Sequence, residues 1–104
     1  MKQEKMSGEY WYCISLATQI GVKRGTLSLL VKGGYITGTM EILGQKQHCT
    51  GRVRRDGSCT LFGELKTLRS VFAYTATGYF NEKTILLDMK YDRGVFRLTG
   101  QNVE

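Results

Sequence analysis

The chain of 104 residues contains no proline, one histidine and three cysteines. It also has no run of about 18 apolar residues, which excludes a helix that crosses a membrane. The first residues, Met1 to Met6, lead directly into the polar Ser7-Gly8-Glu9 without an apolar segment or a small-residue cleavage site. A secretory signal peptide has both of those features, so we expect a cytoplasmic protein.

The small number of cysteines and histidines limits the chemistry that the chain can support. Three cysteines cannot all pair, which argues against a disulfide framework. Cys49 and Cys59 are predicted to be small buried hydrophobic residues. Cys13 falls on the alternate, outward-facing positions of its strand. With one histidine and no Cys-x-x-Cys, we expect no metal site and no cofactor.

The lack of proline coincides with an excess of glycine, and together they favour strands. Average usage would give about 5 prolines and 7 glycines in a chain of this length, whereas this one has 13 glycines and no proline. Disorder does not explain the deviation, because aromatic residues reach 11%. Hydrogen-bonded strands exclude proline because it has no N–H to donate.

Alternation of apolar and polar residues with a period of two runs along the whole chain. It predicts one domain over residues 1–104, with residues 1–7 flexible. The connections are too short for crossovers, so eight strands follow one another in antiparallel order. The predicted strands span residues 9–18, 25–32, 35–43, 46–54, 58–68, 71–80, 84–92 and 95–101.

The turns test whether these strands share one apolar face. A Gly33-Gly34 turn, a three-residue loop ending at Gly57 and a turn at Arg93-Gly94 all place apolar or small residues opposite one another. A further turn at Gly44-Gln45 is expected to pair His48 with Glu41. The three consistent turns predict these inward pairs: Val31 with Ile36, Leu29 with Gly38, Leu27 with Met40, Val53 with Cys59, Gly51 with Leu61, Tyr91 with Phe96, Met89 with Leu98 and Leu87 with Gly100.

Glycines in the middle of strands share the parity of the apolar residues: Gly38, Gly51, Gly63, Gly78 and Gly100. An inward glycine removes bulk and lets a strand bend sharply, as strands in closed barrels must. A flat sheet of eight strands would expose its apolar face and two edges. We therefore predict an all-β fold, a single eight-stranded antiparallel up-and-down (meander) barrel, and keep a sandwich of two four-stranded sheets as the alternative.

Short motifs within the strands resemble those of small bacterial meander barrels that are calycin-like and related to lipocalins. The motifs are Ile36-Thr37-Gly38-Thr39-Met40, Thr50-Gly51-Arg52-Val53, Phe62-Gly63-Glu64-Leu65, Leu98-Thr99-Gly100, and Thr18-Gln19-Ile20-Gly21 before Gly25-Thr26-Leu27-Ser28-Leu29. Lipocalins carry Gly-x-Trp on the first strand and a basic residue on the last, packed together at the closed barrel end. Gly8-Glu9-Tyr10 and Arg97 are the corresponding residues here, with Tyr10 in place of the tryptophan.

The barrel interior is the first candidate site, because an eight-stranded barrel either fills with its own side chains or holds one small ligand. Inward glycines favour space and inward aromatic residues favour filling, so both outcomes stay open. Hydroxyl groups of the inward tyrosines are candidates to orient a ligand. We predict a non-enzymatic protein that binds a small apolar or aromatic molecule with these residues: Tyr12, Met40, Phe72, Tyr74, Phe80, Met89, Tyr91 and Phe96.

The outer surface is the alternative, as an interaction module for a homodimer, a protein or a nucleic acid. The net charge of +6 favours phosphate-bearing partners, with Arg55, Lys66 and Arg69 expected within reach of Arg52 and Arg54. However, Glu41 and Glu64 are expected to interrupt this basic patch, so nucleic acid is the least favoured of these partners. The surface residues singled out are Tyr35, His48, Arg52, Arg54, Phe62 and Tyr79. Phe62, Tyr79, Leu86 and Leu30 form a candidate homodimer seam.

Overall fold

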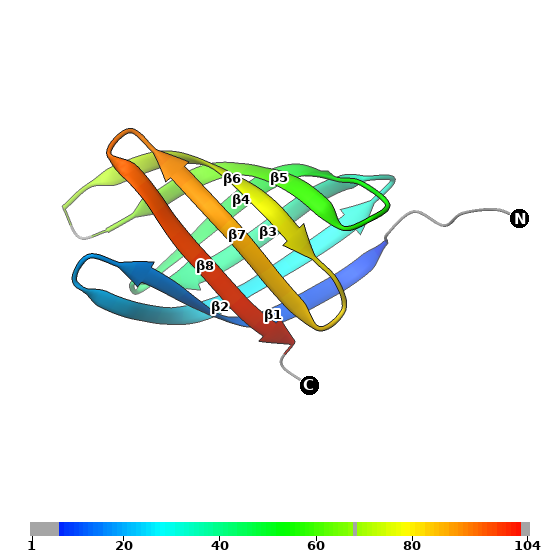
Figure 1. The fold of residues 1–104 in the computed structure, drawn as a ribbon, viewed down its shortest axis with the longest axis horizontal. Helices are drawn as coiled ribbons and strands as arrows, with labels where there is room; N and C mark the ends of the chain where they lie inside the picture. The colour runs from blue at the N-terminus through cyan, green and yellow to red at the C-terminus, as the bar shows by residue number, and fades with distance from the viewer. Residues whose placement is uncertain (1–6, 68, 103–104) are drawn as a thin grey trace, which may run out of the picture.

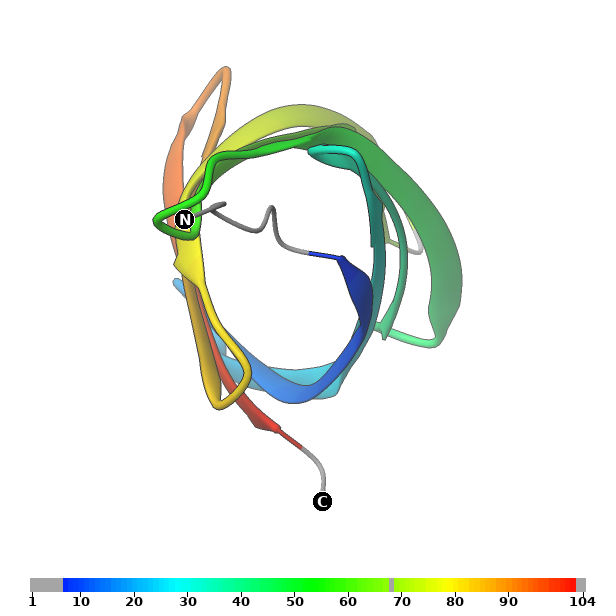
Figure 2. The same ribbon diagram turned by 90° about the vertical axis from the view of Figure 1, so that its right-hand side faces the viewer.

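Eight antiparallel strands, joined in chain order, form one closed barrel in the computed structural model, which describes residues 7–67 and 69–102. The strands are β1 (Gly8–Thr18), β2 (Gly21–Lys32), β3 (Tyr35–Ile42), β4 (Gln45–Val53), β5 (Ser58–Lys66), β6 (Val71–Phe80), β7 (Thr84–Tyr91) and β8 (Gly94–Asn102). β1 pairs with β8 and closes the ring (Figures 1 and 2). The predicted all-β meander barrel is confirmed, and the two-sheet sandwich is excluded.

Two ends of the barrel are distinguished by their turns (Figure 1). The N-terminal end carries the start of β1 and the turns at residues 33–34, 54–57 and 81–83. The opposite end carries the turns at residues 19–20, 43–44 and 92–93, together with the end of β5 and the start of β6. The expectation of a flexible N-terminus covers residues 1–7, of which residues 1–6 lie outside the described residues. The described part of the chain includes no helix long and apolar enough to span a bilayer.

The core lies inside the barrel and consists of the residues that alternation places on the inner face. The buried apolar side chains are Tyr12, Ile14, Leu16, Leu27, Leu29, Val31, Ile36, Met40, Ile42, Cys49, Val53, Cys59, Leu61, Leu65, Tyr74, Ala76, Phe80, Ile85, Leu87, Met89 and Leu98. Burying large aliphatic and aromatic side chains stabilises a fold by roughly 1.5–3 kcal/mol for each. A barrel of this size therefore draws its stability mainly from the lumen.

At two turns the observed cross-strand pairs are the predicted ones. These are the turn between β2 and β3 and the turn between β4 and β5. Val31 pairs with Ile36 across Gly33-Gly34, and both glycines have positive φ, as a two-residue hairpin turn of the I′ type requires. Val53 pairs with Cys59 across the longer turn. β2 starts at Gly21 rather than at residue 25, because its pairing with β1 continues beyond the core to the polar end of that hairpin.

The predicted register is wrong by two residues at the turn between β3 and β4. The turn is Leu43-Gly44, so Glu41 pairs with Lys46 and not with His48. The observed register pairs Gly38 with Cys49, and Ile36 with Gly51. The predicted register would have placed the two glycines opposite each other. Packing a small residue against a larger one fills the lumen better, which favours the observed pairing.

The predicted register is also wrong by two residues at the turn between β7 and β8. The turn is formed by Asp92 and Arg93, with Gly94 following it, so Tyr91 pairs with Gly94. Three predicted inward pairs therefore change partners, and the observed pairs are Met89 with Phe96, Leu87 with Leu98 and Ile85 with Gly100. A shift of two residues preserves the parity of every side chain, and therefore the inner face is still the one predicted.

Candidate functional site

The eight residues predicted to line an interior ligand site all belong to the inner face, but they occupy three levels of the barrel. Tyr12 and Phe80 lie toward the N-terminal end, where their rings meet edge to face with centroids 6.5 Å apart. Met40, Tyr74 and Met89 are buried in the core. At the opposite end, the Tyr91 ring stacks on Phe96 at 4.6 Å and meets Phe72 at 5.4 Å. All of them except Phe72, which contacts Tyr91, belong to one hydrophobic core or pack against it, and they are spread along the length of the barrel.

Protein side chains fill the barrel interior. Tyr12 and Phe80 have no accessible surface, and Met40 and Met89 have 3% and 1%, so little space for even a water molecule adjoins them. The inward glycines do not leave a void either. A Cβ placed on Gly38 would lie 2.8 Å from the Sγ of Cys49 and 2.8 Å from a methyl carbon of Leu29. An interior ligand stays a prediction, and it would have to displace side chains such as the half-buried rings at the opposite end.

Polar groups inside the barrel serve the structure. The Tyr12 hydroxyl donates a hydrogen bond to the backbone oxygen of Asn81, and burial raises the pKa of that hydroxyl. Burial also raises the pKa of Tyr74. The Gln47 Oε1 accepts a hydrogen bond from the Lys66 backbone N–H at 2.6 Å, while its Nε2 is buried without a partner. The Tyr12 bond joins β1 to the turn between β6 and β7, and the Gln47 bond joins β4 to the end of β5. Each bond offsets part of the cost of removing its polar atoms from water.

The cysteines are free thiols, as the odd count predicts. Cys13 is exposed, whereas Cys49 and Cys59 are buried. Burial raises the pKa of Cys49 to about 11 and that of Cys59 to about 12, so both stay protonated and unreactive near neutral pH. Across residues 7–67 and 69–102, no three side chains of His, Cys, Asp or Glu gather in a way that could hold a metal ion.

His48 does not pair with Glu41, as the predicted turn at Gly44-Gln45 would require. Its partner on β3 is Thr39, and Glu41 instead forms an ion pair with Lys46, with the Nζ and Oε2 atoms 3.5 Å apart. His48 is exposed on the outer wall. Sequence reasoning missed this arrangement because the turn position, rather than the strand pattern, decides which outward residues are neighbours.

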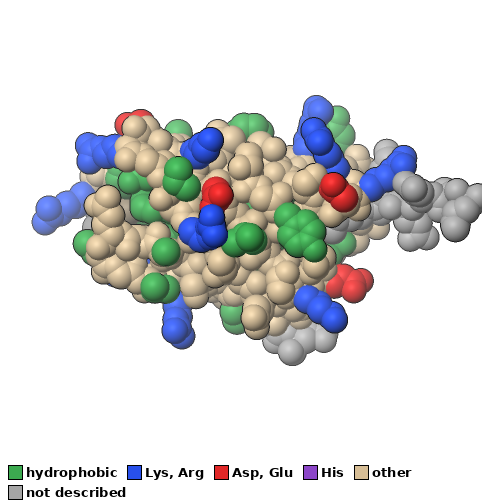
Figure 3. Space-filling view, in the orientation of Figure 1, with side chains coloured by type: hydrophobic (Ala, Val, Ile, Leu, Met, Phe, Trp, Pro, Cys, Tyr) green, Lys and Arg blue, Asp and Glu red, His purple; other side chains and the backbone are tan. Residues whose placement is uncertain are grey.

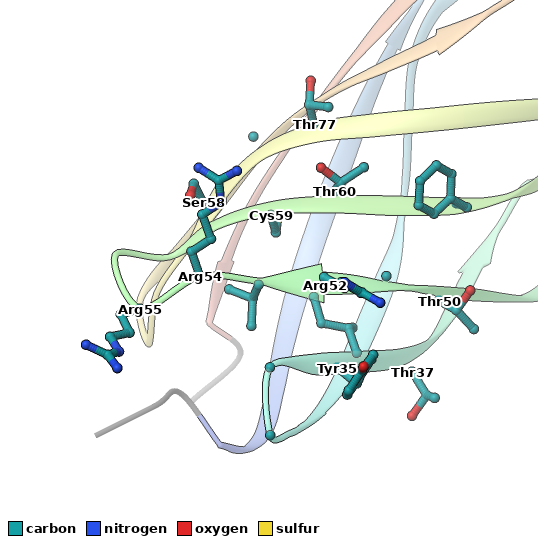
Figure 4. Close-up of a pocket in the computed structure, with 17 residues that line it drawn as sticks. Tyr35, Thr37, Thr50, Arg52, Arg54, Arg55, Ser58, Cys59, Thr60 and Thr77 are labelled. Atoms are coloured by element: carbon teal, nitrogen blue, oxygen red, sulfur yellow. The ribbon is translucent and has the colours of Figure 1, made fainter. Parts of the chain in front are cut away.

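A groove of about 1420 Å³ lies on the outer wall of β3, β4, β5 and β6, toward the N-terminal end (Figure 4). Five of its lining residues are large. Tyr35 and Phe62 are aromatic and exposed, whereas Arg52, Arg54 and Arg55 carry positive charge. The surface residues singled out from the sequence are thus divided: Tyr35, Arg52, Arg54 and Phe62 meet in the groove, while His48 and Tyr79 are not among its lining residues.

Small hydroxyl side chains form the floor of the groove between the large residues. Cross-strand pairing sets Thr50 beside Phe62, and sets Thr60 between Arg52 and Thr77. Threonine on an outward strand position fits the pleated backbone and projects little from it. The floor is therefore low and rich in hydrogen-bonding groups. Figure 4 shows Arg52 and Tyr35 next to these threonines, whereas Arg55 lies at the turn between β4 and β5 and points away from them.

At two glycines that line the groove, the backbones of neighbouring strands lie very close together. A Cβ on Gly51 would lie 1.9 Å from the backbone oxygen of Thr60, and one on Gly78 would lie 2.0 Å from that of Leu86. Both glycines line the groove. Strands bend where glycine lets a neighbouring backbone approach, so an outer wall that would otherwise be convex can become concave.

The electrostatics of the groove are positive. No Asp or Glu is found among the described residues that line it. The Arg52 guanidinium lies over the Tyr35 ring, with its carbon 5.0 Å from the ring centre, and this cation–π contact holds the positive charge against one face of the ring. Asp56, in the adjoining turn, accepts hydrogen bonds from the backbone N–H and hydroxyl of Ser58 at 2.9 and 2.7 Å. The bonds from Ser58 lower the pKa of Asp56, so this carboxylate stays ionised but is engaged within the turn.

The glutamates that were expected to interrupt the basic patch do not line the groove. Glu41 pairs with Lys46 near the opposite end, and Glu64 lies on β5 beyond Phe62, on the side away from Arg52. The expectation that Lys66 and Arg69 lie within reach was wrong. Lys66 ends β5, six residues beyond Thr60, the partner of Arg52, and Arg69 lies in the turn at the opposite end.

The proposed homodimer seam is not one continuous patch. Tyr79 pairs with Leu86 on β6 and β7, whereas Leu30 lies on β2 beside Glu9 and Thr37. On the face shown in Figure 3, hydrophobic side chains occur in small groups separated by charged and polar ones. Scattered exposed apolar residues of this kind are normal on protein surfaces, and the homodimer stays a prediction.

The pattern that resembled lipocalins is not reproduced in space. Arg97 lies opposite Ala17 of β1, seven residues from Tyr10, and its Nε contacts Asp88 Oδ1 at 2.8 Å on the outer wall. Tyr10 instead packs on Phe80, with ring centroids 5.2 Å apart. No protein-family model, curated protein or solved structure matches the chain. The function therefore has to be argued from the groove itself.

Proposed function

We propose that this protein is a non-enzymatic binding module that holds an anionic chain in the groove over β3 to β6. The observation that carries the proposal is that Arg52, Arg54 and Arg55 line one concave surface with no described carboxylate among its lining residues. Guanidinium groups bind phosphate and carboxylate oxygens through paired hydrogen bonds, and concave walls strengthen their field. The net charge of +6 adds long-range attraction for such a partner.

The filled core is the reason for preferring the outer groove to the lumen. A small-molecule site normally buries most of its ligand in a preformed hollow, whereas the deepest interior side chains here have almost no accessible surface. We keep the cytoplasmic location as part of the proposal, since three free cysteines suit a reducing compartment. Kinship with calycins stays a prediction that the meander topology supports only at the level of fold.

Inorganic polyphosphate is a suitable probe, because it offers anionic oxygens and no other recognition element. Binding should be tight at low salt and should weaken strongly in the double variant Arg52→Gln/Arg54→Gln. The matched control is Lys23→Gln/Arg24→Gln on β2, which also lowers the net charge from +6 to +4 (6 − 2) but does so away from the groove. Titration calorimetry measures the affinity of both double variants for polyphosphate.

Two results would contradict this function. Equal weakening in the two double variants would mean that net charge, rather than the groove, attracts the anion. A fatty acid, retinoid, flavin or haem that raises the melting temperature equally in the wild type and in Arg52→Gln/Arg54→Gln would instead favour the barrel interior. Stabilisation by such a ligand grows with the logarithm of its free concentration.

A further inference from the structure

We infer that the anionic chain is a single-stranded nucleic acid whose bases stack on Tyr35 and Phe62. This inference rests on the proposed anion-binding function and names its partner. It begins with the two rings, whose exposed fractions are 60% and 52%. Neither ring contributes to the core, and both line the same groove as the arginines.

Strand register sets the spacing of the two rings. Tyr35 lies opposite Arg52, and Phe62 lies opposite Thr50, so the rings are two strands apart and two residues out of line along β4. With neighbouring strands about 4.8 Å apart and a rise of about 3.3 Å per residue, their backbone positions are roughly 12 Å apart. An extended chain that crosses the groove can therefore place different units on the two rings.

Exposed rings beside arginines distinguish nucleic acids from other polyanions. Every base offers a flat π face to an aromatic side chain, while the phosphates on either side require positive charge. Arg52, 5.0 Å from the centre of the Tyr35 ring, supplies that charge next to a stacking surface. An acidic peptide would use the arginines but would gain little from Phe62. The hydroxyl groups of the floor, such as Thr50 and Thr60, can donate to phosphate oxygens.

A single strand fits this arrangement and a duplex does not. In a duplex the base faces stack on one another and cannot reach side chains that rise from a sheet, whereas unpaired bases can be spread over aromatic platforms. The sequence argued against nucleic acid because Glu41 and Glu64 were expected within the basic patch. Neither lines the groove in the folded protein, and that objection to the inference is removed.

The test uses a fluorescein-labelled oligothymidylate of about 12 nucleotides, within the range of single-strand site sizes. Anisotropy is measured with the full chain across roughly 50 to 200 mM salt. Two phosphate contacts, from Arg52 and Arg54, give a slope of log K against log salt of about −0.7 × 2, or about −1.4. Affinity should therefore fall about 7-fold over that range. A duplex of the same length should bind more weakly at every salt concentration.

Substitution of Phe62 separates stacking from charge. Phe62→Leu keeps an apolar side chain without a ring and should weaken binding by about 5- to 140-fold without changing the salt slope. Arg52→Gln should reduce the magnitude of the slope by about 0.7. Trp11→Leu on β1 is the matched control, because Trp11 is an aromatic residue with 49% exposure that does not line the groove. Circular dichroism establishes that each variant is folded, and Phe62→Tyr, which keeps a ring, should retain binding.

Each outcome decides between the inference and the broader function. Polyphosphate binding that depends on Arg52 and Arg54, without oligothymidylate binding, overturns the nucleic-acid inference and leaves the anion-binding function intact. Failure of both probes overturns both. Equal affinity for single strand and duplex, no effect of Phe62→Leu, or full competition by an oligoglutamate of the same length would each overturn stacking as the basis of recognition.

Discussion

Replacing Gly51 with alanine should destabilise the barrel strongly, because a methyl group at this position of β4 would clash with the backbone of β5. A Cβ on Gly51 would lie 1.9 Å from the backbone oxygen of Thr60 and 2.9 Å from the Cα of Leu61. Gly51 is not among the glycines with positive φ, so alanine itself can adopt its backbone conformation. The cost therefore arises from the contact between strands and not from backbone strain at the substituted residue.

The size of the effect follows from the displacement that the new methyl group requires. Real Cβ atoms essentially never approach closer than 3.0 Å, so β4 and β5 must separate locally by about 1.1 Å (3.0 − 1.9). Such a shift weakens roughly two ladder hydrogen bonds, each worth about 1 kcal/mol, and adds overpacking strain of about 1 kcal/mol or more. We expect a loss of about 3 kcal/mol, or a fall in melting temperature of about 12 to 24 °C.

Thermal and urea unfolding followed by circular dichroism measure this loss, with two variants for comparison. Gly38→Ala should cost less, about 1 kcal/mol, because the atoms nearest its Cβ, the Sγ of Cys49 and the Cδ2 of Leu29, are side-chain ends that can rotate away. Thr50→Ala, on an exposed position of the same strand, should change stability by about 0.5 kcal/mol or less. The reasoning would be refuted if Gly51→Ala matched the wild type, or if Gly38→Ala were the more damaging of the two glycine variants.

The buried thiols give two further predictions. A thiol reagent at neutral pH should modify Cys13 alone in the folded protein and all three cysteines in denaturant; rapid reaction of three thiols in the native state would contradict the burial of Cys49 and Cys59. Because burial raises the pKa of Cys49 to about 11 and that of Cys59 to about 12, the folded state keeps these protons longer than the unfolded chain, whose thiols ionise near pH 9. This contribution to stability is complete below that pH and declines as pH rises toward the folded-state values, so the urea midpoint should fall from about pH 9 upward, and less steeply in Cys49→Ala/Cys59→Ala. A wild-type midpoint that stays constant over that range would show that the thiols are not protected.

The sequence by itself determined which side of each strand faces inward. A strand alternates its side chains with a period of two, and this is a local property that the apolar residues display directly. The number of strands, their antiparallel order and the turn at Gly33-Gly34 followed from it, because short connections leave no other path. Even where the predicted turns were displaced, the inner face was correct, since a shift of two residues preserves parity.

Only the tertiary structure decided which residues are neighbours across strands and where the wall is hollow. Glu41 met Lys46 instead of His48 because packing Gly38 and Gly51 against larger partners selected one register from two of equal parity. The same structure showed that the room left by Gly38 is taken up by Cys49 and Leu29, and that Gly51 brings two backbones together beneath an outer groove. These outcomes depend on distances between segments far apart in the chain. Local periodicity carries no information about such distances, and so the filled lumen and the arginine-lined groove could not be derived from the pattern of residues.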